Sequence, residues 1–173
     1  MRDRVVIGTR ASRLALWQTH HVADLLRAAA PGLTVDVEEF STRGDQILDR
    51  PLAEIGGKGL FTKELERALR DRSIDLAVHS LKDLPVQDPD GLAVAAIPKR
   101  ATPNDALIAR DATSVDSLPE GAKVGTSSPR RKAQLLHKRP DLQIVDIRGN
   151  VETRIGKVLE RKEIDAAVLA CAG

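Results

Sequence analysis

The chain is poor in aromatic residues, with two phenylalanines, one tryptophan and no tyrosine among 173 residues. Proteins that bind single-stranded nucleic acids stack bases on aromatic rings, so this composition argues against that class. Charge is also balanced, because 27 basic and 25 acidic residues give a net charge of +2, whereas a nucleic-acid binder carries a clear basic excess. The core must therefore be built from valine, leucine, isoleucine and alanine, and nucleic acid is not an expected partner.

Cysteine is almost absent as well. The single cysteine, Cys171, excludes an internal disulfide and suits a reducing compartment, and its apolar surroundings in the sequence predict a buried core residue. One cysteine and four scattered histidines are too few for a structural zinc site, so no metal is expected. No apolar run reaches membrane-spanning length, and no signal-peptide core is visible near Met1. We therefore expect a cytoplasmic protein with no membrane partner.

Strand-like and helix-like patterns alternate along the chain, which is typical of an α/β fold with mixed, mostly parallel sheets. Residues 98–104 interrupt the pattern with two prolines, and we interpret them as a hinge between domain 1, residues 1–98, and domain 2, residues 99–173. The similar runs IDLAV at 74–78 and IDAAV at 164–168 suggest two domains of similar build. Strands are expected at 4–9, 33–40, 74–78, 91–97, 105–110, 123–125, 142–147 and 164–170, and helices at 14–30 and 60–72, after Ser127 or Ser128, and after Asn150.

Two of these helices show an apolar stripe at helical spacing. In the first helix the stripe contains Leu14, Trp17, Val22 and Leu25, and in the second it contains Leu60, Phe61, Leu65 and Leu69. Both stripes are expected to be buried.

The expected strand at 74–78 becomes polar immediately after its end. Lys82 and Asp83 follow it and precede Pro85, where the element must stop because proline lacks an N–H. Ligands of open α/β sheets bind beyond the carboxyl ends of the strands, so an acid and a base side by side suit a ligand that carries both charges. Taken alone, an exposed turn with a solvated ion pair explains these two residues better.

A second informative stretch is GTSSPRR, residues 125–131. Ser127 or Ser128 is expected to cap a helix whose first turn begins with Pro129. Arg130 and Arg131 then lie at the positive end of the helix dipole, where a helix selected for stability alone would carry acidic residues. Arginines, hydroxyls and free backbone N–H groups at one helix start therefore indicate an anion site.

Further basic residues follow the other expected strand ends. Arg148 comes after one strand, and Asn150 is expected to cap the helix that contains Arg154. Arg10 and Ser12 lie between the first strand and the first helix, where a surface arginine and a helix cap are the simpler explanations. If the two domains face each other, these cations surround Asp83, which suggests a ligand with several carboxylates.

Residues 41–59 are polar and glycine-bearing, and we expect a long mobile loop. The run from Gly56 to Gly59 contains Lys58 but is not a phosphate-binding loop. Lys58 is followed by glycine rather than serine or threonine, and no strand directly precedes the run. A nucleotide site is therefore not expected.

The motifs GTRASRLALWQ, TRGD, GGKGLFTKELE, DLAVHSLKDLP, GTSSPRRKAQL and DIRGNVETR occur in this order, and together they resemble the porphobilinogen deaminase (hydroxymethylbilane synthase) family. The resemblance extends along the whole chain. It implies an enzyme that condenses four porphobilinogen molecules head to tail and releases ammonia. It also implies a cytoplasmic monomer with two domains like those of periplasmic binding proteins, a third C-terminal domain, and a dipyrromethane cofactor attached to a cysteine.

The resemblance also assigns roles to individual residues. Asp83 would be the catalytic carboxylate, which holds pyrrole N–H groups and stabilises the cation formed when ammonia leaves. Lys58 would belong to the mobile loop over the cleft. Arg10, Ser12, Arg148 and Arg154 would bind the acetate and propionate groups of the substrate, and Lys82, Thr126, Ser128, Arg130 and Arg131 would bind the side chains of the cofactor.

Two departures from the family pattern matter. Glu54 stands where the family often has a second basic residue, so it receives no role. The third domain, the segment that returns to domain 1, and the attachment cysteine are not recognisable here, and Cys171 does not match the attachment motif. We therefore expect a truncated form that is inactive alone and that could associate. The alternative is a binding module for a small polyanion on the same scaffold, because one fold supports many functions.

Overall fold

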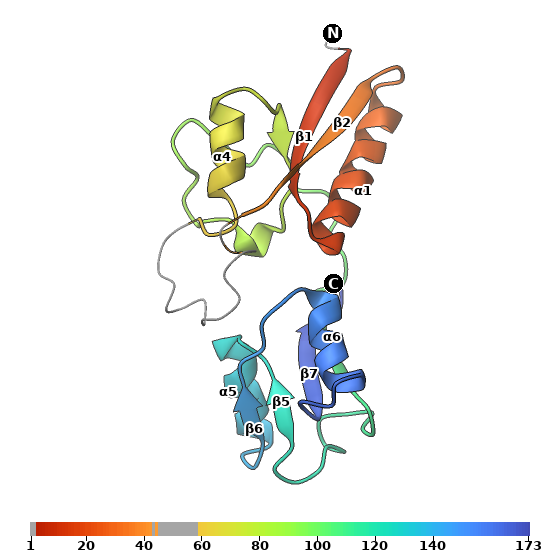
Figure 1. Ribbon diagram of the computed structural model, residues 1–173, viewed down its shortest axis with the longest axis vertical. Coiled ribbons are helices and arrows are strands. Elements are labelled where there is room, and N and C mark those ends of the chain that lie inside the picture. The colour runs from red at the N-terminus through yellow and green to blue at the C-terminus, as the bar shows by residue number, and fades with distance from the viewer. Residues whose placement is uncertain (1–2, 43, 45–58) are drawn as a thin grey trace. The chain divides into compact units, whose positions relative to one another are not determined.

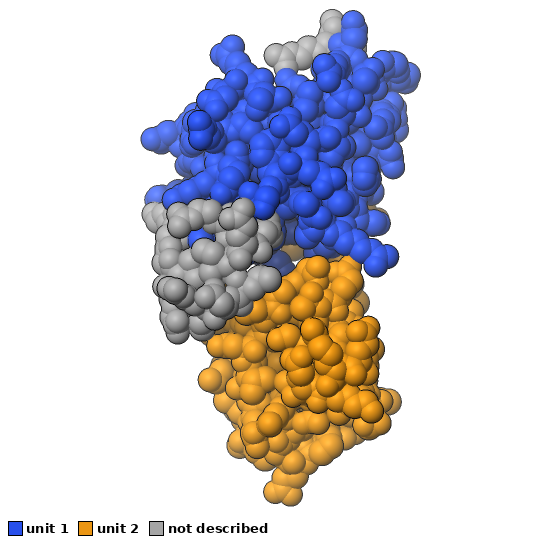
Figure 2. All heavy atoms as spheres, in the orientation of Figure 1, with its two compact units in different colours: residues 1–97 blue, residues 98–173 orange. Residues whose placement is uncertain are grey.

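The computed structural model describes residues 3–42, 44 and 59–173, and the chain forms two compact units, Met1–Ile97 and Pro98–Gly173 (Figures 1 and 2). Each unit has its own sheet with helices packed on it. Most strand pairs are parallel, which confirms the predicted mixed α/β fold. No helix in the described ranges is long and apolar enough to cross a membrane.

Unit 1 is built on a three-stranded parallel sheet with the order β2-β1-β3. The central strand β1 pairs along its whole length with β2, from Arg4 opposite Thr34 to Arg10 opposite Phe40. The elements are β1 (Arg4–Arg10), α1 (Arg13–Ala29), β2 (Thr34–Phe40), α4 (Lys63–Arg70), β3 (Leu76–Ala77) and the short 3-10 helix η1 (Leu81–Asp83).

Unit 2 has a four-stranded sheet with the order β4-β7-β5-β6. Strands β5, β6 and β7 are parallel, and β4 runs antiparallel to β7 along the edge. The order β6-β5-β7 repeats the order β2-β1-β3 of unit 1, and β4 is the addition. The elements are β4 (Asp105–Ala109), β5 (Lys123–Gly125), α5 (Pro129–Lys138), β6 (Gln143–Val145), α6 (Val151–Leu159) and β7 (Ala166–Ala170).

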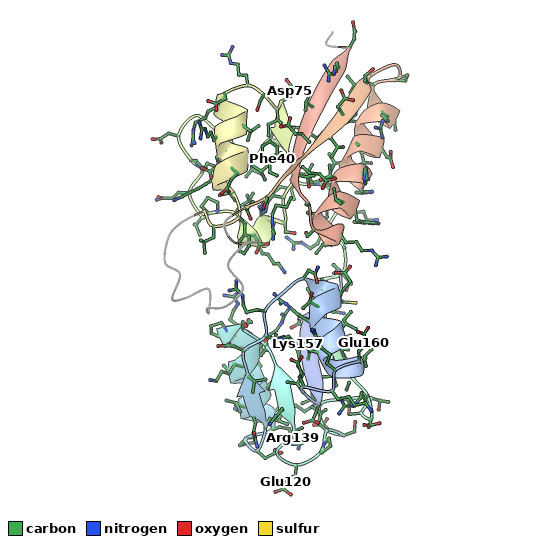
Figure 3. The ribbon with its side chains drawn as sticks, viewed as in Figure 1. Phe40, Asp75, Glu120, Arg139, Lys157 and Glu160 are labelled. Carbon is green, nitrogen blue, oxygen red and sulfur yellow. The ribbon has the colours of Figure 1, made fainter. Side chains whose placement is uncertain are left out.

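The two similar sequence runs occupy equivalent places in the two units. In unit 1 the Asp75 carboxylate accepts the N–H of Val6 at 2.9 Å, and the Asp75 N–H donates to the Val6 carbonyl at 2.9 Å (Figure 3). In unit 2 the Asp165 carboxylate accepts the N–H of Lys123 at 2.8 Å, and the Asp165 N–H donates to the Lys123 carbonyl at 3.0 Å. One aspartate thus fastens the start of each central parallel pair.

Close packing follows directly after this fastening. The isoleucine before each aspartate, Ile74 or Ile164, is buried against a glycine of the neighbouring strand. A Cβ at Gly125 would lie 2.7 Å from Cδ1 of Ile164, and a Cβ at Gly8 would collide with Cδ1 of Ile74. Glycine at these two positions leaves room for the isoleucine side chain to pack directly on the neighbouring strand.

Helix α1 buries a different face from the predicted one. Its buried residues are Ala15, Thr19 and Ala23, whereas Trp17 is 63% exposed and stacks on His21 with ring centroids 5.5 Å apart. Leu25 is also exposed, at 48%. The expectation of a buried Trp17 was wrong because small residues on the opposite face let α1 approach the sheet closely, and that approach decides which face is buried.

Three further expectations are corrected. Residues 91–97 form no strand, and Val94 and Ile97 are 42% and 65% exposed, because an apolar run without a hydrogen-bonding neighbour cannot form a ladder. Helix α4 begins at Lys63, so Leu60 and Phe61 precede it instead of belonging to its face. Cys171 is exposed, because β7 ends at Ala170 and the chain turns there.

One guanidinium organises the end of unit 2 opposite the α5 N-terminus (Figure 3). Arg139 follows α5 and donates to both Asp141 carboxylate oxygens at 2.7 Å. It also donates to the carbonyls of Val115, Asp116, Leu118 and Pro119 at 3.1–3.3 Å, which fixes the loop before β5. The hydrogen bonds from Arg139, and then the N–H of Gly121, hold the pKa of Asp141 well below its usual range, and the same pairing raises the pKa of Arg139.

The pairing of Asp141 with Arg139 predicts that the protein loses stability in acid. The folded pKa of Asp141 lies well below its unfolded value of about 3.9, so its contribution to stability is complete above roughly pH 5 and is lost progressively as the pH falls below the unfolded value and through the folded pKa. We expect Asp141→Asn to lower the melting temperature at pH 7, and we expect this difference to be smaller at pH 2. Thermal melts across this range measure it, with Asp111→Asn as the control, since that carboxylate is 88% exposed. An equal difference at both pH values would contradict it.

The hydrogen bonds of Asp75 and Asp165 predict that removing either carboxylate lowers the free energy of unfolding by a similar amount. Asp165→Ala removes the acceptor for the Lys123 N–H, and we expect it to lower the free energy of unfolding by about 1 kcal/mol. Asp75→Ala is expected to cost a similar amount in unit 1. Urea titrations measure both, with Asp111→Ala as the matched control. If Asp165→Ala behaves like this control, the fastening contributes nothing to stability.

Candidate functional site

In unit 1, the predicted site residues lie where β1 and β3 end. These strands are parallel neighbours with Gly8 opposite Ala77, so their carboxyl ends meet at one edge of the sheet. Arg10 is the last residue of β1, and Ser12 caps α1 by accepting the N–H of Ala15 at 3.3 Å. Lys82 and Asp83 form the second half of η1 beyond β3. The unit therefore brings an arginine, a hydroxyl, a lysine and a carboxylate to the same edge.

Asp83 is exposed on a turn that hydrogen bonds hold in place. Its backbone N–H donates to the Ser80 carbonyl at 3.0 Å, which closes η1. The Ser80 hydroxyl donates to Oε1 of Gln18 on α1 at 3.1 Å. The turn is thus tied to a helix sixty-two residues earlier in the chain, and the carboxylate is presented to solvent from a fixed backbone.

Phe61 is a member of this edge that the sequence reasoning missed. The Arg10 guanidinium lies over its ring, 4.4 Å from the centroid, and its carbonyl is 3.1 Å from Nε2 of His79. A Cβ at Gly44 would collide with the ring, so the glycine of the TRGD motif makes room for it. Its position after a glycine-rich run, in a chain with few aromatic residues, was the available signal. Phe61 joins the start of α4 to Arg10 and the turn after β3.

In unit 2, the corresponding edge lies where β5 and β6 end. These strands are parallel, with Gly125 opposite Val145, and the buried Thr126 donates its N–H to the Val145 carbonyl at 2.9 Å. Thr126 also accepts the Ser128 N–H at 3.3 Å. Ser128, rather than Ser127, caps α5 by accepting the N–H of Arg131 at 3.4 Å, and Pro129 is the first helical residue.

The first turn of α5 carries two arginines and no acidic residue, as the sequence predicts. Arg130 is exposed, and its guanidinium forms no hydrogen bond or ion pair with a described residue, whereas its carbonyl accepts the side-chain amide of Gln134 at 3.3 Å. Arg131 is instead half-buried and bonded to Asp105, with Nε–Oδ2 at 2.9 Å and Nη2–Oδ1 at 2.6 Å. The two arginines therefore differ: among the described residues the Arg130 guanidinium has no partner, whereas Arg131 is held by an acid that the sequence reasoning did not single out.

Arg148 and Arg154 lie beyond the end of β6. Gly149 has a φ of +105°, which favours glycine, and Asn150 caps α6 as predicted by accepting the N–H of Thr153 at 2.8 Å. Nε of Arg154 donates to the Gly149 carbonyl at 2.8 Å, so this half-buried guanidinium turns back toward the start of its own helix. Arg148 is half-buried at the same strand end. The edge of unit 2 thus combines two capped helix starts with four arginines.

Lys58, Glu54 and most of the expected loop at 41–59 lie outside the described residues. Within the part of the chain that the structure describes, no three histidine, cysteine or acidic residues gather in a way that could hold a metal.

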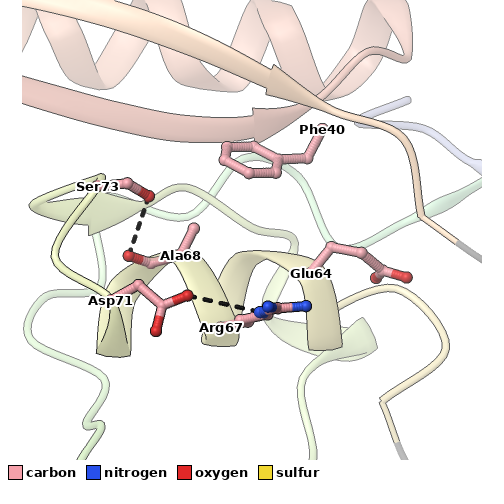
Figure 4. A pocket seen from close by; sticks show the side chains of 6 residues that line it. All are labelled: Phe40, Glu64, Arg67, Ala68, Asp71 and Ser73. Atoms are coloured by element: carbon pink, nitrogen blue, oxygen red, sulfur yellow. Dashed lines mark hydrogen bonds and ion pairs between the residues drawn. The ribbon is translucent and has the colours of Figure 1, made fainter.

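A shallow hollow of about 380 Å³ lies between α4 and Phe40, the last residue of β2 (Figure 4). Most of its polar groups are paired with one another: Arg67 lies 3.5 Å from Asp71, and Ser73 donates to the Ala68 carbonyl at 3.3 Å. Phe40 supplies the apolar wall, and Glu64 completes the lining. The paired polar groups give a ligand little to bind, so the candidate site remains at the strand ends.

Comparison with known proteins shows the family to which the chain belongs. Residues 5–173 match the family described as porphobilinogen deaminase, dipyromethane cofactor binding domain. A porphobilinogen deaminase of Syntrophotalea carbinolica is 58% identical over 167 residues, covering 96% of this chain and 53% of that protein. A porphobilinogen deaminase of Roseiflexus castenholzii is 57% identical over 173 residues, covering 100% of this chain and 57% of that protein. The chain thus spans a little over half the length of these curated relatives.

Among solved structures, a methionine-binding protein, MetQ, aligns with a TM-score of 0.47 and 13% identity. The alignment covers 98% of this chain and 71% of that one.

Replacing the exposed Arg130 with an acidic residue is expected to stabilise the protein and to weaken anion binding. Because it opposes the α5 dipole, Arg130→Glu is expected to raise the free energy of unfolding by about 0.5 kcal/mol at low salt, and the gain should shrink as salt screens it. The same change should abolish binding of a carboxylate ligand at this edge. Urea titrations at two salt concentrations measure the gain. Lys99→Glu is the control, because it makes the same charge change outside any helix. A loss of stability at low salt would contradict the dipole argument.

Proposed function

Because the chain belongs to the porphobilinogen deaminase family, we propose that it forms the part of such an enzyme that binds substrate and cofactor carboxylates. The enzyme condenses four porphobilinogen molecules head to tail into hydroxymethylbilane and releases ammonia. The observation that carries the proposal is the pair of sheet edges, each with basic side chains next to a serine-capped helix start. Porphobilinogen carries one acetate and one propionate group, and such cationic edges suit a chain of these units.

The capping serines fit this role through their unused protons. Ser12 and Ser128 each accept a backbone N–H through the hydroxyl oxygen. A hydroxyl that accepts in this way still has its own proton to donate, and a carboxylate oxygen is a suitable acceptor. A carboxylate at either helix start would also lie at the positive end of the helix dipole. The caps therefore stabilise the helices and provide a donor to an anion.

Asp83 takes the catalytic role in this proposal. Each condensation breaks the bond between the aminomethyl carbon and nitrogen, and ammonia leaves a cation that is conjugated with the pyrrole ring. An exposed carboxylate on a fixed turn stabilises that cation and can accept the pyrrole N–H. Lys82 beside it binds an anionic side chain, so acid and base on one turn hold opposite ends of the same unit.

The remaining roles are those that the family resemblance implies. Arg10 and Ser12 in unit 1, with Arg148 and Arg154 in unit 2, bind substrate carboxylates. Lys82, Thr126, Ser128, Arg130 and Arg131 bind those of the dipyrromethane cofactor, and Lys58 belongs to the segment that covers the ligand. Hydroxyls and guanidiniums are the donors that cofactor carboxylates require, so the donor set fits the group. When bound, the cofactor supplies the pyrrole end to which new units are joined.

The proposal includes domain 1 at 1–98, domain 2 at 99–173 and further polypeptide beyond them. The relatives are nearly twice as long, and sheet β2-β1-β3 shows no counterpart of β4 among the described residues. A returning segment and a third domain with the attachment cysteine would supply these parts, so Cys171 is not the attachment site. We propose a monomeric, cytoplasmic enzyme, and the single thiol suits that compartment.

The catalytic role of Asp83 is tested in a protein of the relatives' full length. We expect Asp83→Asn to lower kcat by about a hundredfold or more, because the carboxylate acts mainly on the developing cation. Porphobilinogen affinity should change little, because the guanidiniums that bind its carboxylates remain. Ammonia release measures kcat, and calorimetry measures affinity.

Asp88→Asn is the matched control, because it neutralises an exposed carboxylate five residues later. The 173-residue chain alone should bind porphobilinogen without forming tetrapyrrole. If Asp83→Asn keeps full turnover, Asp83 is not the catalytic group. If the full-length protein binds porphobilinogen but releases no ammonia, a polyanion-binding module replaces the enzyme.

A further inference from the structure

We propose that Asp105 is a positioning residue, which holds the Arg131 guanidinium so that one defined edge of it receives a ligand carboxylate. This inference rests on the proposed function of Arg131 as a carboxylate ligand. Asp105 is the first residue of β4, opposite Ala170 of β7, and it comes from a different element than the arginine it contacts. All the residues involved belong to unit 2.

The Arg131 guanidinium is already bonded through its Nε–Nη2 side. The Asp105 carboxylate takes Nε at 2.9 Å and Nη2 at 2.6 Å, which is the paired, charge-assisted geometry of a strong arginine–carboxylate contact. The Val168 carbonyl of β7 takes Nη1 at 3.3 Å. Two groups from the β4–β7 edge thus define the plane and the direction of the guanidinium.

Counting donors shows what remains for a ligand. A guanidinium has five N–H groups, and three of the five are used by Asp105 and Val168. One N–H of Nη1 and one N–H of Nη2 remain. Two N–H groups of one guanidinium can donate to the oxygens of a second carboxylate. Asp105 therefore selects the edge of Arg131 that a ligand meets.

Comparison with Arg130 shows why this matters. Arg130 is exposed beside Arg131 and must lose side-chain freedom when it binds an anion. Arg131 has already lost that freedom in the free protein, because the fold holds it. The Asp105 charge also offsets that of Arg131 in the first turn of α5, where the helix dipole disfavours a cation. Of the two arginines, Arg131 is preorganised and Arg130 is not.

Asp105 could also compete with the ligand for Arg131, so the sign of the change in affinity distinguishes competition from positioning. A carboxylate that competes with the ligand for Arg131 would weaken binding, so its removal would tighten binding. A carboxylate that positions Arg131 would strengthen binding, so its removal would weaken it. A purely structural ion pair would change melting temperature and leave the affinity of the folded protein unchanged.

The probe is a free dipyrromethane that carries acetate and propionate side chains, titrated calorimetrically into the 173-residue chain. We expect Asp105→Asn to weaken binding by about tenfold, within the range for residues in direct contact. Asp105→Glu should recover part of the loss, because it restores a carboxylate. In an Arg131→Ala background, Asp105→Asn should have no further effect, because the aspartate acts only through that arginine.

Asp116→Asn is the matched control, since it removes an acidic partner, that of Lys138, from the other end of α5 with the same charge change. It should leave the dissociation constant unchanged. Thermal melts of every variant allow affinities to be compared at equal folded fractions.

Two results overturn the role of Asp105 alone: unchanged or tighter binding by Asp105→Asn while Arg131→Ala still weakens binding, or additive losses in the double variant. If the parent chain does not bind the probe, or Arg131→Ala binds as well as the parent, the proposed carboxylate site itself fails and the role of Asp105 fails with it.

Discussion

In both units, an aspartate at the start of one strand exchanges hydrogen bonds with the backbone of the central strand beside it. The N–H and carbonyl of Val6 are bound by Asp75, and those of Lys123 are bound by Asp165. A parallel pair has no hairpin to set its register, so a local contact must do this. The exchange fixes where each pair begins, and since both strands rise equally per residue, it also fixes the register along the pair.

The strand ends explain the chemistry of the molecule. Because each central strand is parallel to its neighbours, the turn into the following helix and the turn after the next strand lie at the same edge of the sheet. The helices that follow the two central strands, α1 and α5, are both capped by serine, and neither has an acidic residue in its first turn. Each edge therefore keeps positive charge that a helix selected only for stability would neutralise. The fold gives up some helix stability and gains two places with positive charge, as the proposed carboxylate sites require.

The helices with local start signals were predictable from sequence. Ser12, Ser128 with Pro129, and Asn150 act within a few residues, and each caps as expected. Features that depend on distant partners were not. Residues 91–97 have the composition of a strand but no pairing neighbour among the described residues.

Burial and the finer parts of the site depend on distant partners in the same way. Trp17 fits the apolar stripe of α1, yet the small residues on the other face decide its packing. Asp105 and Phe61 join the candidate site only through contacts across the sheet and between loops.

The exposed Trp17 and Cys171 have a practical consequence. Each is the only residue of its type, and they lie in different units. A dye on the thiol would accept excitation energy from the indole, so the unmutated chain already carries a spectroscopic ruler between its two halves.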